Sequence, residues 1–257
     1  MSLSSSEWHA RFTQQTRWTH DLRRYLYTRA GLPSAQRVLE VGIGTGALLP
    51  ELASNTSAQL IGLDINRIFI SYARENNPAA TLLQADAHYL PFSGHTFDLC
   101  LCHFLLLWVV DPIRVIKEMV RLTRPGGAVL AIAEPDYGGR IDYPPELEVL
   151  GSLQEASLRQ QGADTRLGRR LATMFYQAGL KPVEYGILGG QWATDPSIVD
   201  GQIEWSVLHA DLKVLSQGAD TILSPQDLDT LAEIDRQASL HGERILFVPT
   251  FYAWGRV

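Results

Sequence analysis

Three glycines and one acidic residue are grouped in the segment VLEVGIGTGALL, at positions 38–49. Gly42, Gly44 and Gly46 are spaced two residues apart, which is typical of a loop whose backbone turns tightly and lies close to a ligand. The helix expected after this loop directs its free N–H groups toward the same place. Glu40 stands just before the turn. The segment therefore predicts a site for a nucleotide-like ligand.

Two kinds of nucleotide ligand fit this loop. Read as G-x-G-x-x-A from Gly42, it matches a dinucleotide fingerprint, with Asp64 about 20 residues further on to bind ribose hydroxyls. An NAD-dependent oxidoreductase is therefore one hypothesis, although the chain has no Y-x-x-x-K sequence. Glu40 argues against a pyrophosphate, because two negative charges repel each other, and favours a ligand with a cationic end. Asp86 provides a second acidic residue, which can accept a hydrogen bond from an exocyclic amine.

Alternating strands and helices position these residues. A helix is expected over 7–30, before the first strand. Apolar runs predict buried strands and the segments between them predict helices, which indicates an α/β fold with a parallel sheet and helices on both faces. The expected strands are 37–41, 59–65, 81–84, 97–103 and 128–133, and the expected helices are 47–53, 66–76 and 111–124.

The second half of the chain is less regular. A polar and aromatic loop is expected at 134–145. Helices are expected at 145–161, 168–178 and 224–240, and strands at 181–188 and 245–254. Without a repeat or a linker, the chain is predicted to form a single domain. Its core would comprise about 34–188 and 244–257, with cap elements at 1–33 and 189–243.

The composition excludes several classes of protein. A net charge of -6 argues against a nucleic-acid partner, which requires a basic face. The longest apolar run, at 99–110, is shorter than the roughly 20 residues that a membrane span needs. The only cysteines, Cys100 and Cys102, lie in this run and are expected to pack in the core, without a disulfide framework or a metal site. We expect a cytoplasmic protein that does not insert into a membrane.

Four segments together resemble a known family. VLEVGIGTG, LIGLDI, LLQADAHYLPFSGHTFDLCLC and RLTRPGGAVLAIAEP are similar to class I S-adenosylmethionine-dependent methyltransferases, and most of all to the small-molecule branch that includes ubiquinone/menaquinone-type C-methyltransferases. The resemblance spans roughly 37–135 and implies a Rossmann-like, seven-stranded, mostly parallel sheet whose last strand is antiparallel. The N-terminal helix and the C-terminal-half insertion would cap the site. S-adenosylmethionine would donate the methyl group, leaving S-adenosylhomocysteine.

The resemblance also implies roles for residues at the first two strand ends. The glycine loop would face the methionine part of the cofactor, and Glu40 would anchor its amino-acid end or order the loop. Asp64 would bind the ribose hydroxyls, and Ile65 would pack on the adenine. Glu40 as a loop brace, and Asp64 as a helix or turn cap, are the structural alternatives.

Further roles are implied at the next strand ends. Asp86 would accept a hydrogen bond from the adenine amine, or else cap a turn, and Ala87 would offer its backbone N–H. His103 would lie next to the methyl group, or else be a structural histidine at the strand end whose hydrogen bonds are satisfied within the protein. His103 and Glu134 are the candidate catalytic residues, although Glu134 could instead brace the loop. A base is needed only where the acceptor must lose a proton.

The methyl acceptor is expected to be a small molecule. The fourth strand is followed by His103-Phe104-Leu105-Leu106, where many nucleic-acid and protein N-methyltransferases carry N/D-P-P-Y/F. Aromatic residues outside the core suggest an apolar or aromatic acceptor, with core packing as an equal alternative. A cofactor-binding protein without catalysis stays an open hypothesis. The candidate acceptor-binding residues are Trp18, Tyr137, Arg140, Trp205 and His209.

Overall fold

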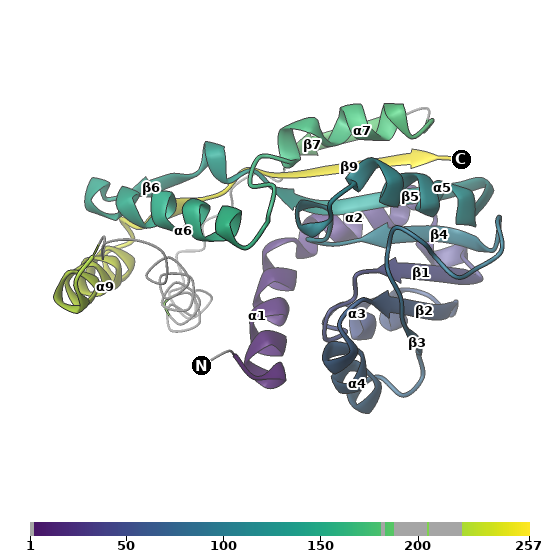
Figure 1. Cartoon of the computed structure of the whole chain (residues 1–257), viewed down its shortest axis with the longest axis horizontal. Helices are drawn as coiled ribbons and strands as arrows, with labels where there is room; N and C mark the ends of the chain where they lie inside the picture. The colour runs from purple at the N-terminus through teal and green to yellow at the C-terminus, as the bar shows by residue number, and fades with distance from the viewer. Residues whose placement is uncertain (1–2, 181–182, 188–204, 206–222) are drawn as a thin grey trace. The chain divides into compact units, whose positions relative to one another are not determined.

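The computed structural model describes residues 3–180, 183–187, 205 and 223–257. The chain divides into two compact units. Figure 1 labels most of the helices and strands. The first unit comprises Met1–Glu134, Leu167–Leu188 and Thr250–Val257, and the second comprises Pro135–Arg166 and Gly189–Pro249. The N-terminal helices thus group with the sheet. The single domain inferred from the sequence stays a prediction.

A seven-stranded sheet forms the centre of the first unit. Its strands lie in the order β3-β2-β1-β4-β5-β9-β7. The β1–β2, β1–β4, β2–β3 and β4–β5 pairs are parallel, and the β7–β9 pair is antiparallel. The Rossmann-like fold predicted from the sequence is confirmed. The strands are β1 (Arg37–Val41), β2 (Gln59–Asp64), β3 (Thr81–Gln84), β4 (Phe97–Cys102), β5 (Thr123–Pro135), β7 (Val183–Ile187) and β9 (Thr250–Arg256).

The strand order brings separate segments of the sequence to one place. Strands β2 and β3 follow β1 in the sequence and lie on one side of it in the sheet. Strand β4 pairs with the opposite edge of β1. The loops after β1 and β4 therefore start at neighbouring strand ends and diverge, which is where open α/β sheets bind ligands. The glycine loop follows β1 and His103 follows β4.

Helices cover both faces of this sheet. Leu26, Leu49 and Ile70 share a buried cluster with Val38 and Leu99 of the strands. On the other face, α5 and α7 contact β4 and β9. The helices of the first unit are α1 (Ser5–Trp18), α2 (His20–Ala30), α3 (Leu49–Asn55), α4 (Arg67–Asn76), α5 (Pro112–Leu122) and α7 (Leu171–Gln177), with short 3₁₀ turns η1 (Leu32–Ser34), η2 (Leu106–Trp108) and η5 (Gly168–Arg170).

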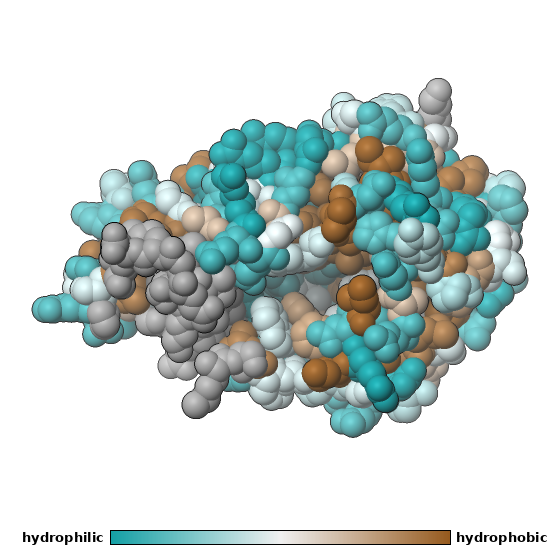
Figure 2. Space-filling model, viewed as in Figure 1, coloured by the Kyte–Doolittle hydropathy of each residue, from teal (hydrophilic) through white to brown (hydrophobic). Residues whose placement is uncertain are grey.

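Most apolar residues of the predicted strands are buried in the core. Cys100 and Cys102 are free thiols with no exposed surface, so the core-packing interpretation is confirmed. Figure 2 shows that hydrophobic side chains also reach the viewed face, among hydrophilic ones. The large exposed apolar residues of the first unit include Ile65, Ile68, Tyr89, Trp108 and Val110.

The N-terminal segment consists of two helices, so the single helix predicted over 7–30 is wrong. Thr19, with φ −109° and ψ 8°, leaves the helical conformation between α1 and α2. Its side chain is fully buried and contacts His103, which follows β4. The amphipathic spacing of apolar residues runs through both helices, so it does not indicate the bend at Thr19. No proline or glycine lies at the bend, and Thr19 instead contacts His103, which is distant in the sequence.

In the part of the second unit that the structure describes over whole elements, two long helices accompany a two-stranded sheet. Strand β6 (Ile141–Tyr143) pairs antiparallel with β8 (Ile245–Phe247). The segment 134–145, predicted as a loop, therefore contains a strand. The strand predicted over 245–254 is two strands in different sheets, because Pro249, which lacks an N–H, interrupts it. The other elements are η3 (Tyr137–Gly139), η4 (Pro145–Leu147), α6 (Glu148–Gln160) and α9 (Pro225–Leu240).

A network of ion pairs is buried within the second unit. The Asp142 side chain is 2% exposed and pairs with Arg140 at 2.6 Å and with Arg244 at 2.8 Å. Arg244 also pairs with Asp235 of α9 at 2.6 Å. The charges are compensated within the unit, as burial requires. The network therefore links β6, α9 and the start of β8.

Candidate functional site

The glycine loop after β1 adopts a backbone that disfavours other residues. Gly42, Gly44 and Gly46 have φ values of +76°, +53° and +80°. A Cβ at Gly42 would lie 2.6 Å from Leu105 Cδ1, and a Cβ at Gly44 would lie 2.8 Å from Phe12 Cε2. Both backbone conformation and space therefore require glycine here. The glycine spacing predicted that another group approaches this backbone closely. In this structure, the groups that do so are the side chains of Leu105 and Phe12.

Asp64, at the end of β2, holds the glycine loop. Its Oδ2 accepts a hydrogen bond of 2.8 Å from the Gly44 N–H, and its Oδ1 accepts one of 2.8 Å from the Asn66 N–H. Burial raises the pKa of Asp64, and the backbone N–H groups oppose that rise. Each carboxylate oxygen has a second lone pair for a ligand hydroxyl. Ile65 beside it is 67% exposed and offers an apolar surface.

Asp86 follows β3 and is exposed enough to meet a ligand. Its side chain is 45% exposed. Its Oδ1 accepts from the His88 N–H at 2.9 Å and lies 2.7 Å from His88 Nδ1. These hydrogen bonds lower the pKa of Asp86, so it is ionised near neutral pH. Ala87 is 9% exposed. The carboxylate is oriented by its own turn and can still accept a donor.

Glu40 is a buried carboxyl group with an unsatisfied oxygen. The residue is 3% exposed, and its Oε2 has no hydrogen-bond partner among the residues that the structure describes. Burial raises the pKa of Glu40 to about 8; the Arg23 guanidinium opposes this, and Asp64 and Glu51 add to it. A buried polar atom without a partner costs stability unless a ligand satisfies it. The glycine loop and Glu40 together fit a ligand that carries a cationic donor.

Helix α1 lies against the glycine loop. His9 Nδ1 and Thr45 Oγ1 are 2.9 Å apart. Phe12, over Gly44, packs edge-on against Phe69 of α4 with ring centroids 5.7 Å apart. Trp18, a predicted acceptor-binding residue, is 44% exposed and lies under the Arg11 guanidinium at 5.0 Å. Helix α1 therefore covers this loop, and its role as a cap over the ligand stays a prediction.

His103 stands just after β4 and contacts the bend between α1 and α2. Its Nε2 lies 2.9 Å from Thr19 Oγ1. Burial lowers the pKa of His103 to about 3, and the Arg23 guanidinium adds to this effect. The ring is therefore neutral over the physiological range of pH. A neutral imidazole of such low basicity suits hydrogen bonding better than proton abstraction.

Glu134, at the end of β5, binds the turn after β4. Its Oε1 accepts from the N–H groups of Leu105 and Leu106 at 3.2 and 2.9 Å, and its Oε2 accepts from the Leu107 N–H at 3.1 Å. The residue is fully buried, and burial raises its pKa to about 7 against these hydrogen bonds. This geometry favours the bracing interpretation. The same turn places Leu105 against Gly42.

The remaining predicted acceptor residues belong to the second unit. The Arg140 side chain is 8% exposed and pairs with Asp142, so its charge is already neutralised. Trp205 donates its Nε1–H to Asp235 Oδ2 at 3.1 Å and packs on a buried cluster with Leu147. Tyr137 donates its backbone N–H to the Thr165 carbonyl. His209 lies outside the described residues.

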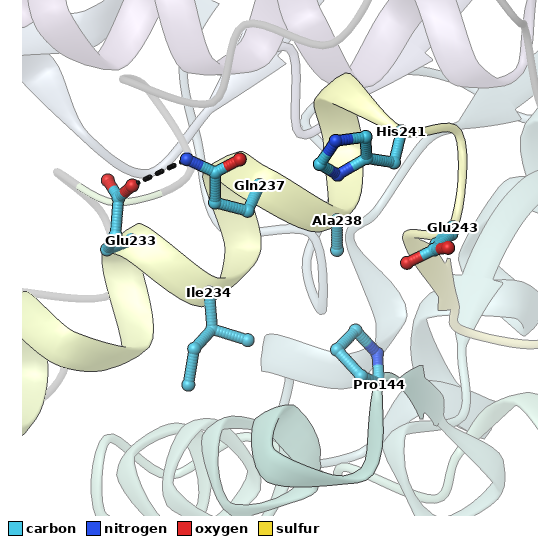
Figure 3. Close-up of a pocket in the computed structure, with 7 residues that line it drawn as sticks. All are labelled: Pro144, Glu233, Ile234, Gln237, Ala238, His241 and Glu243. Atoms are coloured by element: carbon cyan, nitrogen blue, oxygen red, sulfur yellow. Dashed lines mark hydrogen bonds between the residues drawn. The ribbon is translucent and has the colours of Figure 1, made fainter.

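A pocket is found within the second unit, along α9. Its volume is about 260 Å³. Figure 3 shows Ile234, Ala238 and Pro144 on its apolar side and the hydrogen bond of 2.8 Å from Gln237 to Glu233. No residue predicted for the site lines it. Its lining is Pro144, Glu233, Ile234, Gln237, Ala238, His241 and Glu243.

Sequence reasoning missed three residues that the structure brings to the site. Arg23 and Thr19 lie near His103, and Arg23 pairs with Glu51 of α3. Arg23 is only 1% exposed. Arginine is rarely buried, and the residues around Arg23 in the sequence do not indicate that this one is. Within the described residues, no group of three or more His, Cys, Asp or Glu side chains is placed to hold a metal ion.

Comparison with known proteins identifies the family. A family described as a methyltransferase domain matches residues 39–131. Demethylmenaquinone methyltransferase of Bacillus licheniformis is 30% identical over 202 residues, which cover 71% of this chain and 85% of that enzyme. The chain is a class I S-adenosylmethionine-dependent methyltransferase. Phosphatidylethanolamine N-methyltransferase of Cereibacter sphaeroides is 41% identical over 102 residues, covering 37% of this chain and 49% of that enzyme.

Solved structures share the fold of this methyltransferase. Phosphoethanolamine N-methyltransferase 2 of Haemonchus contortus, in complex with S-adenosylmethionine, has a TM-score of 0.57 and 17% identity, over 92% of this chain and 52% of that one. The [4+2]-cyclase SpnF has a TM-score of 0.57 and 17% identity, over 92% of this chain and 79% of that one. A cyclase on this fold shows that the fold alone does not determine the reaction.

The enzyme uses S-adenosylmethionine as its cofactor. The glycine loop and the unsatisfied Glu40 oxygen fit this cofactor better than a dinucleotide, because its amino-acid end carries an ammonium group and no phosphate. The NAD-dependent alternative is therefore not favoured. Among the described residues, no helix is both long and apolar enough to span a bilayer.

Proposed function

We propose that this enzyme transfers a methyl group from S-adenosylmethionine to a small-molecule acceptor. The observation that carries the proposal is the 30% identity to a demethylmenaquinone methyltransferase over 85% of that enzyme. The net charge of -6 supports it, because a nucleic-acid acceptor would favour a basic surface. His103-Phe104-Leu105-Leu106 after β4 supports it as well, since this sequence departs from N/D-P-P-Y/F.

The proposal assigns the cofactor's methionine and ribose parts to the ends of β1 and β2. Gly42, Gly44 and Gly46 would lie against the methionine part, and Glu40 would accept from its ammonium group through the free Oε2. Asp64 would accept from the ribose hydroxyls while it holds the Gly44 N–H. The sulfonium supplies an already activated methyl group, so these residues mainly align donor and acceptor.

The proposal assigns the adenine and the methyl group to the next strand ends. Ile65 would pack on the adenine, which its 67% exposure favours. Asp86 would accept from the adenine amine with Oδ2, because Oδ1 is already bound to His88. Ala87 would donate its backbone N–H. His103 would lie beside the methyl group, at the end of β4 next to β1.

The acceptor is proposed to be apolar or aromatic. Trp18 remains a candidate for its binding, because it is 44% exposed on a helix that lies against the glycine loop. Tyr137 also remains a candidate. The internal hydrogen bonds of Arg140 and Trp205 favour a structural role for both. The low cysteine content favours a cytoplasmic location, which stays a prediction.

The test measures release of S-adenosylhomocysteine with different acceptors. We expect release with a short-chain demethylmenaquinone analogue, supplied in its reduced form because a quinol is the more nucleophilic. Phosphatidylethanolamine vesicles, a protein mixture and transfer RNA are the comparison acceptors. Release only with protein or RNA would contradict a small-molecule acceptor. S-adenosylmethionine binding without release by any acceptor would instead support the non-catalytic hypothesis.

Binding of S-adenosylhomocysteine should release a proton from Glu40. With a pKa raised to about 8, free Glu40 is protonated near neutral pH, and a bound ammonium group favours its ionised form. The affinity should therefore rise with pH by up to about tenfold per pH unit, and level off near pH 8. Calorimetry in two buffers of different ionisation enthalpy measures the proton release.

Glu40→Gln is the control for this prediction. Glutamine has nearly the same shape but does not titrate, so its binding should be weaker at pH 8 and nearly independent of pH. The same pH slope in Glu40→Gln would assign the proton to another group, such as Asp64, whose pKa burial also raises. Glu75→Ala, an exposed change on α4, should keep the wild-type slope.

A further inference from the structure

A chain of polar side chains runs from α3 to His103. The Arg23 side chain on α2 is 1% exposed. Its Nε donates to Glu51 Oε1 at 2.8 Å, and one terminal nitrogen donates to the other Glu51 oxygen. The second terminal nitrogen donates to Thr19 Oγ1 and to the Thr16 carbonyl. All three guanidinium nitrogens of Arg23 therefore donate hydrogen bonds, and the Thr19 hydroxyl oxygen accepts one of them.

The position of the Thr19 proton decides the state of His103. A hydroxyl has one proton to donate, and Thr19 Oγ1 already accepts from Arg23. Two acceptors are within reach: His103 Nε2 at 2.9 Å and the Thr16 carbonyl at 3.5 Å. The second distance is beyond the range of an O–H···O hydrogen bond. A protonated Nε2 would leave the Thr19 proton only the Thr16 carbonyl at 3.5 Å, so the contacts favour donation from Thr19 to an unprotonated Nε2.

An unprotonated Nε2 leaves the proton of neutral His103 on Nδ1. A doubly protonated ring would need a second acceptor and would lie near the Arg23 charge, which lowers the pKa of His103 together with burial. Among the described residues, His103 Nδ1 has no hydrogen-bond partner. Its N–H is thus available to a ligand. The ring carries a donor on the side away from Thr19.

We propose that Thr19, oriented by Arg23 and Glu51, fixes His103 as the Nδ1–H tautomer, so that His103 is a hydrogen-bond donor and not a base at the methyl-transfer site. Thr19, Arg23 and Glu51 are positioning residues, because they act through His103. The role toward the acceptor rests on the proposed function. The tautomer does not, since it follows from contacts within the protein.

A donor at this place selects a class of acceptor. An Nδ1–H favours an acceptor with an anionic or carbonyl oxygen close to the atom that is methylated, because the hydrogen bond holds and stabilises that oxygen. A phenolate or enolate provides such an oxygen and makes the adjacent carbon nucleophilic. The methyl group passes from sulfur to that carbon, and the proton which the carbon then loses goes to solvent or another group. His103 holds the oxygen and takes no proton.

Nitrogen-15 NMR of histidine-labelled full-length protein tests the tautomer directly. Donor and acceptor ring nitrogens have well separated shifts, and His103→Gln identifies the signals by their loss. Between about pH 5 and pH 8, we expect Nδ1 of His103 to show the shift of a protonated nitrogen and Nε2 that of an unprotonated one, without titration. A wild-type ring with Nε2–H, or one that titrates in this range, overturns the proposal.

Variants at Thr19 test the positioning role. Thr19→Val keeps the volume and removes the hydroxyl, so the signals of His103 should shift toward a mixture of tautomers. Thr19→Ser keeps a hydroxyl and should restore the wild-type shifts. Unchanged shifts in a folded Thr19→Val protein would contradict the positioning role. The wild-type spectrum decides the tautomer even where Thr19→Val does not fold.

A binding measurement separates this inference from the proposed function. S-adenosylhomocysteine is added to the labelled wild-type protein, and its affinity is measured by calorimetry. Binding together with an Nε2–H ring would overturn the tautomer and leave the methyltransferase site intact. An Nδ1–H ring whose shifts do not respond to S-adenosylhomocysteine or to the reduced quinone analogue would support the tautomer and contradict its place at the methyl group.

Discussion

Glu134→Ala is expected to lower the free energy of unfolding by about 3 kcal/mol or more. The carboxylate accepts hydrogen bonds from three consecutive N–H groups, of Leu105, Leu106 and Leu107. Leu106 and Leu107 are buried, so alanine leaves these donors without a partner in a place that water does not easily reach. Urea unfolding measures the change.

Local hydrogen exchange sharpens this prediction. The amides of 105–107 should exchange much faster in Glu134→Ala, while those of the distant strand β3 change only with global stability. Glu134→Gln should lie between the two proteins, because its amide group keeps one acceptor oxygen and loses the other. Glu75→Ala, exposed on α4, is the matched control and should stay within about 0.5 kcal/mol of wild type.

The same variants distinguish the two interpretations of Glu134. If Glu134 only braces the turn after β4, Glu134→Ala should lose stability. Folded Glu134→Gln protein should then keep considerable activity. A catalytic base predicts the reverse, with full stability and no methyl transfer in Glu134→Gln. Since Glu134 has a pKa of about 7 and is fully buried, a pH profile of activity adds a second measure: a base would give a rise with pH near that value.

Asp64→Ala is expected to weaken S-adenosylhomocysteine binding by about 1–3 kcal/mol, or roughly fivefold to 150-fold. In the proposed site the carboxylate loses its hydrogen bonds to the ribose hydroxyls, and the Gly44 N–H loses the acceptor that orders the loop. Calorimetry measures the affinity. Unchanged affinity would contradict the assignment of Asp64 to the ribose.

A cofactor analogue separates the two parts of this effect. A 2′,3′-dideoxy form of S-adenosylhomocysteine lacks the hydroxyls, so Asp64→Ala should cost less binding energy with it than with the parent compound. The difference between the two losses is the contribution of the ribose contacts. The part that remains is the contribution of the loop. Asp64→Asn keeps one acceptor oxygen and should fall between wild type and Asp64→Ala.

Much of the first unit is readable from short segments of the sequence. Apolar runs bounded by glycine, asparagine and proline predict β1 and β3 at their observed bounds, and Asn66, the first residue of the predicted helix 66–76, is the N-cap of α4. These signals are local, because a buried strand, a turn with positive φ and a helix cap each depend on a few adjacent residues. The resemblance to methyltransferases also rests on short segments of this kind and on their order in the sequence.

The second unit shows where such local signals end. Strand β6 has three residues in a segment rich in turn-forming residues, and it exists through its pairing with β8, about 100 residues further along. Arg140 reads as a free cation in the sequence, whereas the fold buries it against Asp142. Neither the pairing of an edge strand nor the burial of a charge is encoded by neighbouring residues.

The sequence of this protein determines the succession of strands and helices from β1 to β5, the glycine loop, and the acidic residues at or just beyond the ends of β2, β3 and β5. It does so because those features depend on residue type and short spacing. Only the tertiary structure shows that Thr19 meets His103 across 84 residues, that Arg23 meets Glu51, and that Glu134 binds the turn after β4. Such contacts depend on the order in which strands pair, and a hydrogen bond between distant residues leaves no periodic trace in the chain.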